Sequence, residues 1–123
     1  MIGTKPKRML CPVGKSSVDT LISWIRNEVE LSIWSGNTFR KGFSSKRMHD
    51  HLKRSDLHSF AQLDNKGDLL CYADIVRGKE STGILCRVIV HPNRRRQGLG
   101  KAFCKDLLTW AKEEGGYRKI HLN

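Results

Sequence analysis

A cluster of glycine and arginine residues between positions 93 and 101 has the composition of an anion-binding turn. Gly98 and Gly100 carry no side chain that would keep a ligand away from the backbone. Positions 94, 95 and 96 are all arginine and add positive charge. A helix that begins at such a turn has N–H groups without partners inside the helix, and these favour phosphate. The sequence therefore predicts a phosphate-binding turn.

The segments on both sides of this turn have the patterns of a strand and a helix. Residues 83–90 are apolar at most positions, which is typical of an interior strand covered on both faces. Pro92 cannot donate a hydrogen bond to a sheet, so the strand is expected to end near His91. From Leu99 onward, apolar residues recur every three or four positions, which predicts a helix over residues 98–114.

The rest of the chain predicts one α+β domain over residues 1–123, with helices on both faces of a mixed sheet. The expected element order is β-α-α-β-β-β-α-β. Strands are expected at residues 7–13, 57–63, 68–76 and 117–122. One helix is expected to follow Gly14, with Ser16 or Ser17 as its cap and an apolar stripe that reaches Val29. A second, very basic helix is expected from Ser44 or Ser45 to Leu57, with its basic face in solvent.

A loop is expected between these helices, over residues 31–42. Trp34 and Phe39 flank a turn at Gly36 and Asn37. Aromatic residues in such a loop either pack onto the core or line the mouth of a pocket.

The composition limits the classes of protein that the chain can belong to. The formal net charge is +11, which favours anionic partners, but the excess is spread along the chain. No recognition-helix, zinc-finger or RNP pattern accompanies it, so a nucleic-acid-binding module is only the third alternative. No apolar segment is long enough to span a membrane, and no secretory signal is present, which predicts a cytoplasmic location.

The cysteines and histidines do not form a metal-binding pattern. Cys11, Cys71, Cys86 and Cys104 contain no C-x-x-C pair, and the five histidines are not spaced as zinc ligands with them. The cysteines are interpreted as small apolar residues, three in strands and one in a helix.

Two nucleotide-binding motifs can be tested on the glycines and rejected. A P-loop that ends at Gly100 and Lys101 requires glycine at position 95 and serine or threonine at position 102, where arginine and alanine stand. A dinucleotide-binding G-x-G-x-x-G motif that starts at Gly98 requires glycine at position 103, where phenylalanine stands.

A third motif does match. The run RRQGLG at residues 95–100 resembles the acetyl-CoA motif Q/R-x-x-G-x-G/A of the GCN5-related N-acetyltransferases, and it follows a V-x-V-x-P strand end, as in that family. The resemblance extends over residues 7–123. It implies direct transfer of an acetyl group from acetyl-CoA to an amine, without a metal.

The resemblance also implies roles for individual residues. The backbone of the central strand would pair with the pantetheine arm and polarise the thioester carbonyl, and the turn would cradle the pyrophosphate. The acceptor amine would enter near the aromatic loop. The residues that the resemblance assigns to acetyl-CoA are Val88, Ile89, Val90, Arg95, Arg96, Gln97, Gly98, Leu99, Gly100 and Lys101, and those it assigns to the acceptor are Trp34, Asn37 and Phe39.

The sequence departs from the family where catalytic groups are expected. Residues 84–90 contain no acidic residue, and Asn123 stands where some members have a glutamate. Glu80 and His91 are the remaining candidates for an acid or base. The fold is expected without the last helix and strands of the family, with a homodimer that covers the open sheet edge. The alternative function is a catalytically weak or inactive CoA-binding or interaction protein of the same fold.

Overall fold

The structure, a computed structural model, describes residues 10–123 and contains one five-stranded sheet in which the strands follow chain order. The first three pairs of neighbouring strands are antiparallel, and the last pair is parallel. The mixed sheet expected from the sequence is therefore confirmed. The strands are β1 (Leu10–Cys11), β2 (Leu57–Leu63), β3 (Leu69–Arg77), β4 (Thr82–Val90) and β5 (Lys119–Leu122).

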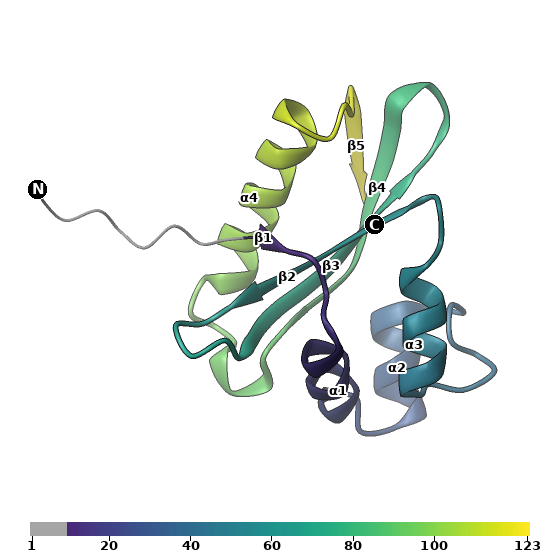
Figure 1. The fold of residues 1–123 in the computed structure, drawn as a ribbon, viewed down its shortest axis with the longest axis vertical. Coiled ribbons are helices and arrows are strands. Elements are labelled where there is room, and N and C mark those ends of the chain that lie inside the picture. Colours follow the sequence, from purple (N-terminus) through teal and green to yellow (C-terminus); the bar gives the residue numbers. More distant parts are fainter. Residues whose placement is uncertain (1–9) are drawn as a thin grey trace, which may run out of the picture.

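Helices cover both faces of this sheet, as expected. In the described residues they are α1 (Lys15–Trp24), α2 (Glu28–Ser35), α3 (Ser45–Leu52) and α4 (Leu99–Glu113), with two short 3-10 turns at residues 79–81 and 92–94. Figure 1 shows α1, α2 and α3 together at one end of the picture and α4 on the other side of the strands. Within residues 10–123, no helix is long and apolar enough to cross a membrane.

Alternating residues of β3 supply the two halves of the core. Tyr72 faces the cluster that α1 and α3 cover, with Leu21 and Met48 in contact with it. Ala73 and its neighbours face the other cluster, which α4 covers. This alternation is the period of a strand that is buried on both faces.

The region between residues 15 and 35 was predicted wrongly. The structure contains two helices there, so three helices precede β2 and the element order is β-α-α-α-β-β-β-α-β. The first helix ends at Trp24, and the residue in its N-cap position is Gly14 rather than Ser16 or Ser17, so it has no side-chain cap. Val29 lies in α2 with 68% of its surface exposed, so it is no part of the buried stripe.

Two further boundaries and the burial of one strand differ from the expectation. In the described residues, the strand expected at residues 7–13 is β1, which ends at Cys11 rather than Val13. Residues 7–9 of that expected strand lie outside the described part of the chain. The helix α3 ends at Leu52 rather than Leu57, while Ser44 does cap it by accepting from the N–H of Arg47. The strand β4 is an interior strand, but its Ile84 is 41% exposed, so one face is not fully covered.

Candidate functional site

A cavity of about 710 Å³ lies beside β4 and brings distant segments of the chain together. One wall is the main chain and side chains of Arg87, Val88 and Ile89. The opposite wall comes from the end of α1 and from α2, and it includes Trp34. Arg95 of the glycine-rich turn closes one end. Two of the predicted elements, the central strand and the turn after it, therefore border the same space.

The central strand is irregular where it meets this cavity. Tyr72 of β3 pairs with Ile89 and Asp74 pairs with Cys86, so two residues of β4 lie opposite one residue of β3. This is a β-bulge, in which the extra residue is left out of the hydrogen-bonded ladder. Arg87 within the bulge has a φ of 51°, a left-handed conformation that is unfavourable for any residue with a Cβ. The cost is on the order of 1–3 kcal/mol, and surrounding contacts must hold it.

Trp34 is one of these contacts. Its indole Nε1 donates to the main-chain oxygen of Arg87 over 2.8 Å. Because a peptide unit is planar, this bond also fixes the direction of the N–H of Val88. The indole ring stacks on Phe39 with 5.9 Å between centroids and meets the ring of Tyr72 edge-on at 5.8 Å. A rigid aromatic cluster therefore orients the bulge from the side of α2.

The side chain of Arg87 is held by hydrogen bonds to Asp74 and Thr38. Its Nε donates to the carboxylate of Asp74, which is completely buried, and its Nη1 donates to Thr38 Oγ1 over 3.2 Å. The same carboxylate accepts from His51 Nε2 at 2.9 Å and from the hydroxyls of Ser59 and Tyr72, each at 2.5 Å. The network joins α3, β2, β3 and β4 in the core beneath the cavity.

Asp74 is ionised in this network. Burial alone raises the pKa of a carboxyl group, because a low dielectric disfavours the charge. Here the hydrogen bonds from His51, Arg87 and Ser59, together with the charge of Arg87, outweigh burial and hold the pKa of Asp74 below its ordinary value. A buried carboxylate and a nearly buried guanidinium thus neutralise each other beside the bulge.

The glycine-rich turn has the backbone that an anion site requires. Gly98 precedes α4 with a φ of 77°, and a Cβ built on it would meet nothing within 4 Å. The first main-chain bond of the helix runs from the N–H of Ala102 to the oxygen of Gly98. The N–H groups of residues 99–101 therefore have no partner within the helix. The open space beside Gly98 and the unpaired N–H groups therefore lie together at the N-terminal end of α4.

Close packing fixes the position of the turn against the strand. A Cβ on Gly100 would lie 3.1 Å from Val90 Cγ2, so a larger residue would push α4 away from β4. Arg95 Nε donates to the main-chain oxygen of Val90 over 3.2 Å, and Arg94 Nε donates to the side-chain oxygen of Gln97 over 3.2 Å. The other predicted ligands, Arg96, Leu99 and Lys101, are exposed or half-buried at the start of α4.

The two predicted acid or base candidates do not line the cavity. Glu80 lies in the exposed 3-10 turn before β4. His91 packs its ring against Trp24 with 5.3 Å between centroids, and its Nδ1 accepts from the N–H of Asn93 over 3.0 Å.

Sequence reasoning missed the carboxylate that does reach the cavity. Among the described residues that line it, Glu30 is the one acidic side chain. It forms an ion pair with Arg26 at 2.9 Å, and the hydrogen bond from this arginine lowers the pKa of Glu30. Glu30 is the third residue of α2, and its N–H donates to the side chain of the N-cap residue Asn27. Asn followed three residues later by Glu is a helix-capping pattern that the sequence does contain.

The predicted acceptor residues separate into two groups. Trp34 lines the cavity beside β4, whereas Asn37 and Phe39 line a second cavity of about 560 Å³ on the other side of α2. Phe39 is 5% exposed and stacks on Trp34, so it packs onto the core, one of the two roles considered for it.

The described cysteines and histidines do not gather into a metal-binding cluster. In the part of the chain that the structure describes, no three His, Cys, Asp or Glu residues could hold a metal ion. Cys71 and Cys86 are buried, and burial raises the pKa of Cys71 to about 11. The basic face expected on α3 is solvated except for His51, which is buried against Asp74.

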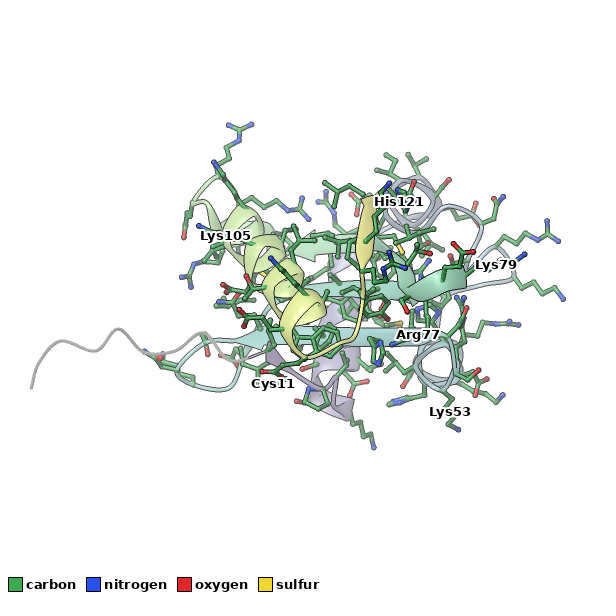
Figure 2. All side chains as sticks on the ribbon, turned by 90° about the horizontal axis from the view of Figure 1, so that it is seen from above. Cys11, Lys53, Arg77, Lys79, Lys105 and His121 are labelled. Carbon is green, nitrogen blue, oxygen red and sulfur yellow. The ribbon has the colours of Figure 1, made fainter. Side chains whose placement is uncertain are left out.

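Labelled lysines lie on different parts of the fold. Figure 2 shows Lys105 of α4 well apart from Lys53, which follows α3, and from Lys79, which precedes β4. A nucleic-acid-binding module stays the third alternative, and no contact in the described residues adds to it.

The sequence matches one family model, described as the acetyltransferase (GNAT) family, over residues 26–123. The matched range includes α2, the whole of β2–β5, the glycine-rich turn and α4.

Several solved structures have the same fold. An acetyltransferase from Trypanosoma brucei is 18% identical with a TM-score of 0.64, and the match covers 94% of this chain and 81% of that one. Ribosomal-protein-alanine N-acetyltransferase from Brucella melitensis is 17% identical with a TM-score of 0.65, with coverage of 94% and 77%. Spermidine N-acetyltransferase from Vibrio cholerae, in complex with CoA and spermine, is 12% identical with a TM-score of 0.71, with coverage of 93% and 69%.

Proposed function

Because this chain belongs to the GNAT family of acetyltransferases, we propose that it is an acetyl-CoA-dependent N-acetyltransferase that moves the acetyl group directly to an amine. One observation carries the proposal. The bulged part of β4 and the glycine-rich turn border a single cavity, and the wall opposite them is formed by α1 and α2. A cofactor arm and an acceptor can therefore meet there.

Residues of the cavity, together with residues of the glycine-rich turn that do not line it, fit the parts of acetyl-CoA. The open space beside Gly98 and the N–H groups at the start of α4 suit a pyrophosphate, since both the unpaired donors and the helix dipole favour negative charge. The proposed pyrophosphate site also includes Arg96, Gln97, Leu99, Gly100 and Lys101. The main chain of Val88, Ile89 and Val90 would lie along the pantetheine arm, with Arg95 between the two parts.

The thioester would then lie beside the bulge. An N–H group that the ladder leaves unpaired can donate to the thioester carbonyl and stabilise the oxyanion that forms in the transition state. The neutral acceptor nitrogen attacks this carbonyl carbon, the bond from carbon to sulfur breaks, and the sulfur leaves as the CoA thiolate. The attacking nitrogen releases a proton as the amide forms, and an equivalent proton converts the thiolate to the CoA thiol. Donors that are already in place at the bulge require no reorganisation during this step.

Glu30 is proposed to bind the acceptor rather than to take its proton. Its lowered pKa makes it a weak base, but an ionised carboxylate attracts an ammonium group into the cavity. The amine would lose its proton to solvent before the attack. Trp34 supplies an apolar wall on the same side, while Asn37 and Phe39, which line the other cavity, are left out of this proposal.

A second candidate is a CoA-binding protein of the same fold with weak or no catalysis. It is favoured by one observation: among the described residues lining the cavity, the single carboxylate is already paired with Arg26, and no imidazole lines it.

We also propose that the protein is cytoplasmic and forms a homodimer. Support for the dimer comes from apolar side chains on β4 and β5, with Ile84 41%, Val88 36% and Leu122 71% exposed. Light scattering at micromolar concentration tests it, and a strictly monomeric species would contradict it.

The release of CoA thiol from acetyl-CoA, measured with a panel of amines, tests the enzymatic proposal. Spermidine, a peptide with an amino-terminal alanine and the aminoglycoside sisomicin are suitable probes, because proteins of similar fold are described with such molecules. Thiol release that depends on one of these amines is expected. Binding of CoA without thiol release for any amine would favour the second candidate instead.

A further inference from the structure

The bulge in β4 contains an arginine where the backbone is left-handed. Glycine occupies such positions at no steric cost, and most other residues avoid them. Arg87 has a φ of 51° there, and 11% of its side chain is exposed. Its Nε and Nη1 donate within a polar network, while its Nη2 is buried without a hydrogen-bond partner. An unfavourable backbone conformation persists where surrounding contacts hold it, and it is often found at functional sites.

Three contacts hold Arg87, and they come from three different elements. Its Nε donates to the buried carboxylate of Asp74 on β3. Its Nη1 donates to Thr38 in the turn after α2, and its main-chain oxygen accepts from Trp34 on α2. The side chain and the main chain of this one residue are therefore each held by separate hydrogen bonds.

These contacts determine the direction of the peptide groups in the bulge. The planar peptide between residues 87 and 88 has its oxygen fixed by Trp34, so its N–H is fixed as well. The guanidinium prevents the preceding part of the strand from rotating, because Asp74 also accepts from His51 on α3 and from Ser59 on β2. Arg87 therefore links β4, proposed to lie along the cofactor, with α2, proposed to lie beside the acceptor.

We propose that Arg87 is a positioning residue, whose buried guanidinium, anchored on Asp74, holds the bulge of β4 so that its N–H groups polarise the thioester carbonyl of bound acetyl-CoA. This inference rests on the proposed function and goes beyond it, because it assigns the geometry of the main-chain donors to a side chain that acts by holding the strand rather than by binding a reacting group.

The carbonyl stretching frequency of acetyl-CoA labelled with ¹³C at the thioester carbon tests the proposal directly. A carbonyl that accepts a hydrogen bond absorbs at lower frequency than the same carbonyl without a hydrogen bond. The measurement uses bound acetyl-CoA alone, so it requires no knowledge of the acceptor amine. In the native protein, the bound label is expected at lower frequency than in the Arg87→Gly variant. Glycine permits the left-handed backbone and keeps the main-chain oxygen that accepts from Trp34, but it removes the side-chain contacts with Asp74 and Thr38. The part of the strand before residue 87 is then no longer held.

Two matched variants separate positioning from folding. Ser59→Ala removes a different hydrogen bond to the same carboxylate and leaves Arg87 in place, so its bound label is expected at the native frequency. The double variant Arg87→Gly with Asp74→Asn removes both buried charges, so no unpaired charge destabilises it, and it is expected to lose the shift like Arg87→Gly. All variants are expected to bind CoA within about threefold of the native affinity.

Each outcome decides between the claims. The native frequency in Arg87→Gly or in the double variant, with CoA affinity retained, overturns the role of Arg87 and leaves the proposed function intact. Equal loss of the shift in Ser59→Ala and Arg87→Gly also overturns it, because the network would then act only through general stability. No shift in the native protein, or no binding of acetyl-CoA, overturns the inference and the proposed polarisation together.

Discussion

Replacing Asp74 by asparagine removes one negative charge from the core with almost no change of shape. Arg87 is then left with a nearly buried guanidinium and no counter-charge. Breaking a buried ion pair by removing one partner costs about 3–5 kcal/mol, because the remaining charge stays desolvated. Domains of this size have a total free energy of unfolding of roughly 5–15 kcal/mol, so the loss is a large fraction of the whole.

The chain offers a control with the same chemistry at its surface. Asp56 pairs with Arg54 at 2.8 Å, but the two side chains are 44% and 38% exposed. Exposed pairs of this kind contribute about 0–1 kcal/mol, since solvent screens them. The Asp56→Asn variant is therefore expected to unfold at nearly the same urea concentration as the native protein, while Asp74→Asn unfolds at a much lower one.

The effect of Asp74→Asn also depends on pH in a defined direction. The pKa of Asp74 is lowered in the folded protein, whereas an unfolded aspartate has a pKa of about 3.9. Its contribution to stability is thus complete above the unfolded pKa and is lost as pH falls through the folded pKa. The difference in unfolding free energy between native and Asp74→Asn protein should be constant above about pH 5 and shrink below about pH 4.

Urea denaturation followed by tryptophan fluorescence, at several pH values, measures both effects. The account would be refuted by a loss below about 1 kcal/mol for Asp74→Asn at pH 7, equal to that of the surface control. The account would also be refuted if the difference in unfolding free energy between the native protein and Asp74→Asn grew as the solution is acidified. A carboxyl group with a lowered pKa requires this difference to shrink at low pH.

Further predictions concern the turn, the sheet and a buried thiol. Gly98→Glu should abolish CoA binding, whereas Gly67→Glu should not, because Gly67 also has a positive φ and open space but lies in the hairpin after β2. Equal affinities of the two variants for CoA would argue against the turn as the phosphate site. Gly83→Ala should lower the unfolding free energy by about 1–3 kcal/mol, because its Cβ would meet the Tyr117 ring at 2.8 Å, and an unchanged melting temperature would count against that packing. Burial raises the pKa of Cys71 to about 11, so iodoacetamide should not modify it in the folded protein at pH 8; rapid labelling detected by mass spectrometry would contradict this.

The sequence predicted those features that depend on neighbouring residues. The strand, turn and helix around Gly98 follow from local periodicity and from the lack of a donor at Pro92, and the structure contains all three. The helix α2 was missed because its aromatic residues and the following Gly36 suggested a loop. Asn27 and Glu30 at its start form a capping pattern that could have indicated it.

The buried network could not be predicted from local patterns. His51 and Asp74 lie 23 positions apart, and only the pairing of β2 with β3 and the packing of α3 bring them together. His51 belongs to a helix that is otherwise strongly basic, so a solvated role was the natural expectation. The left-handed backbone of Arg87 likewise has no sequence pattern, because arginine shows no preference for it.

Calorimetric titration of the native protein with acetyl-CoA, and separately with CoA, tests the central claim most directly. The account predicts one saturable site for each ligand with a dissociation constant below about 1 mM. The absence of binding for both ligands at millimolar concentration would contradict it, because the cavity beside β4 and the turn at Gly98 would then not be a CoA site.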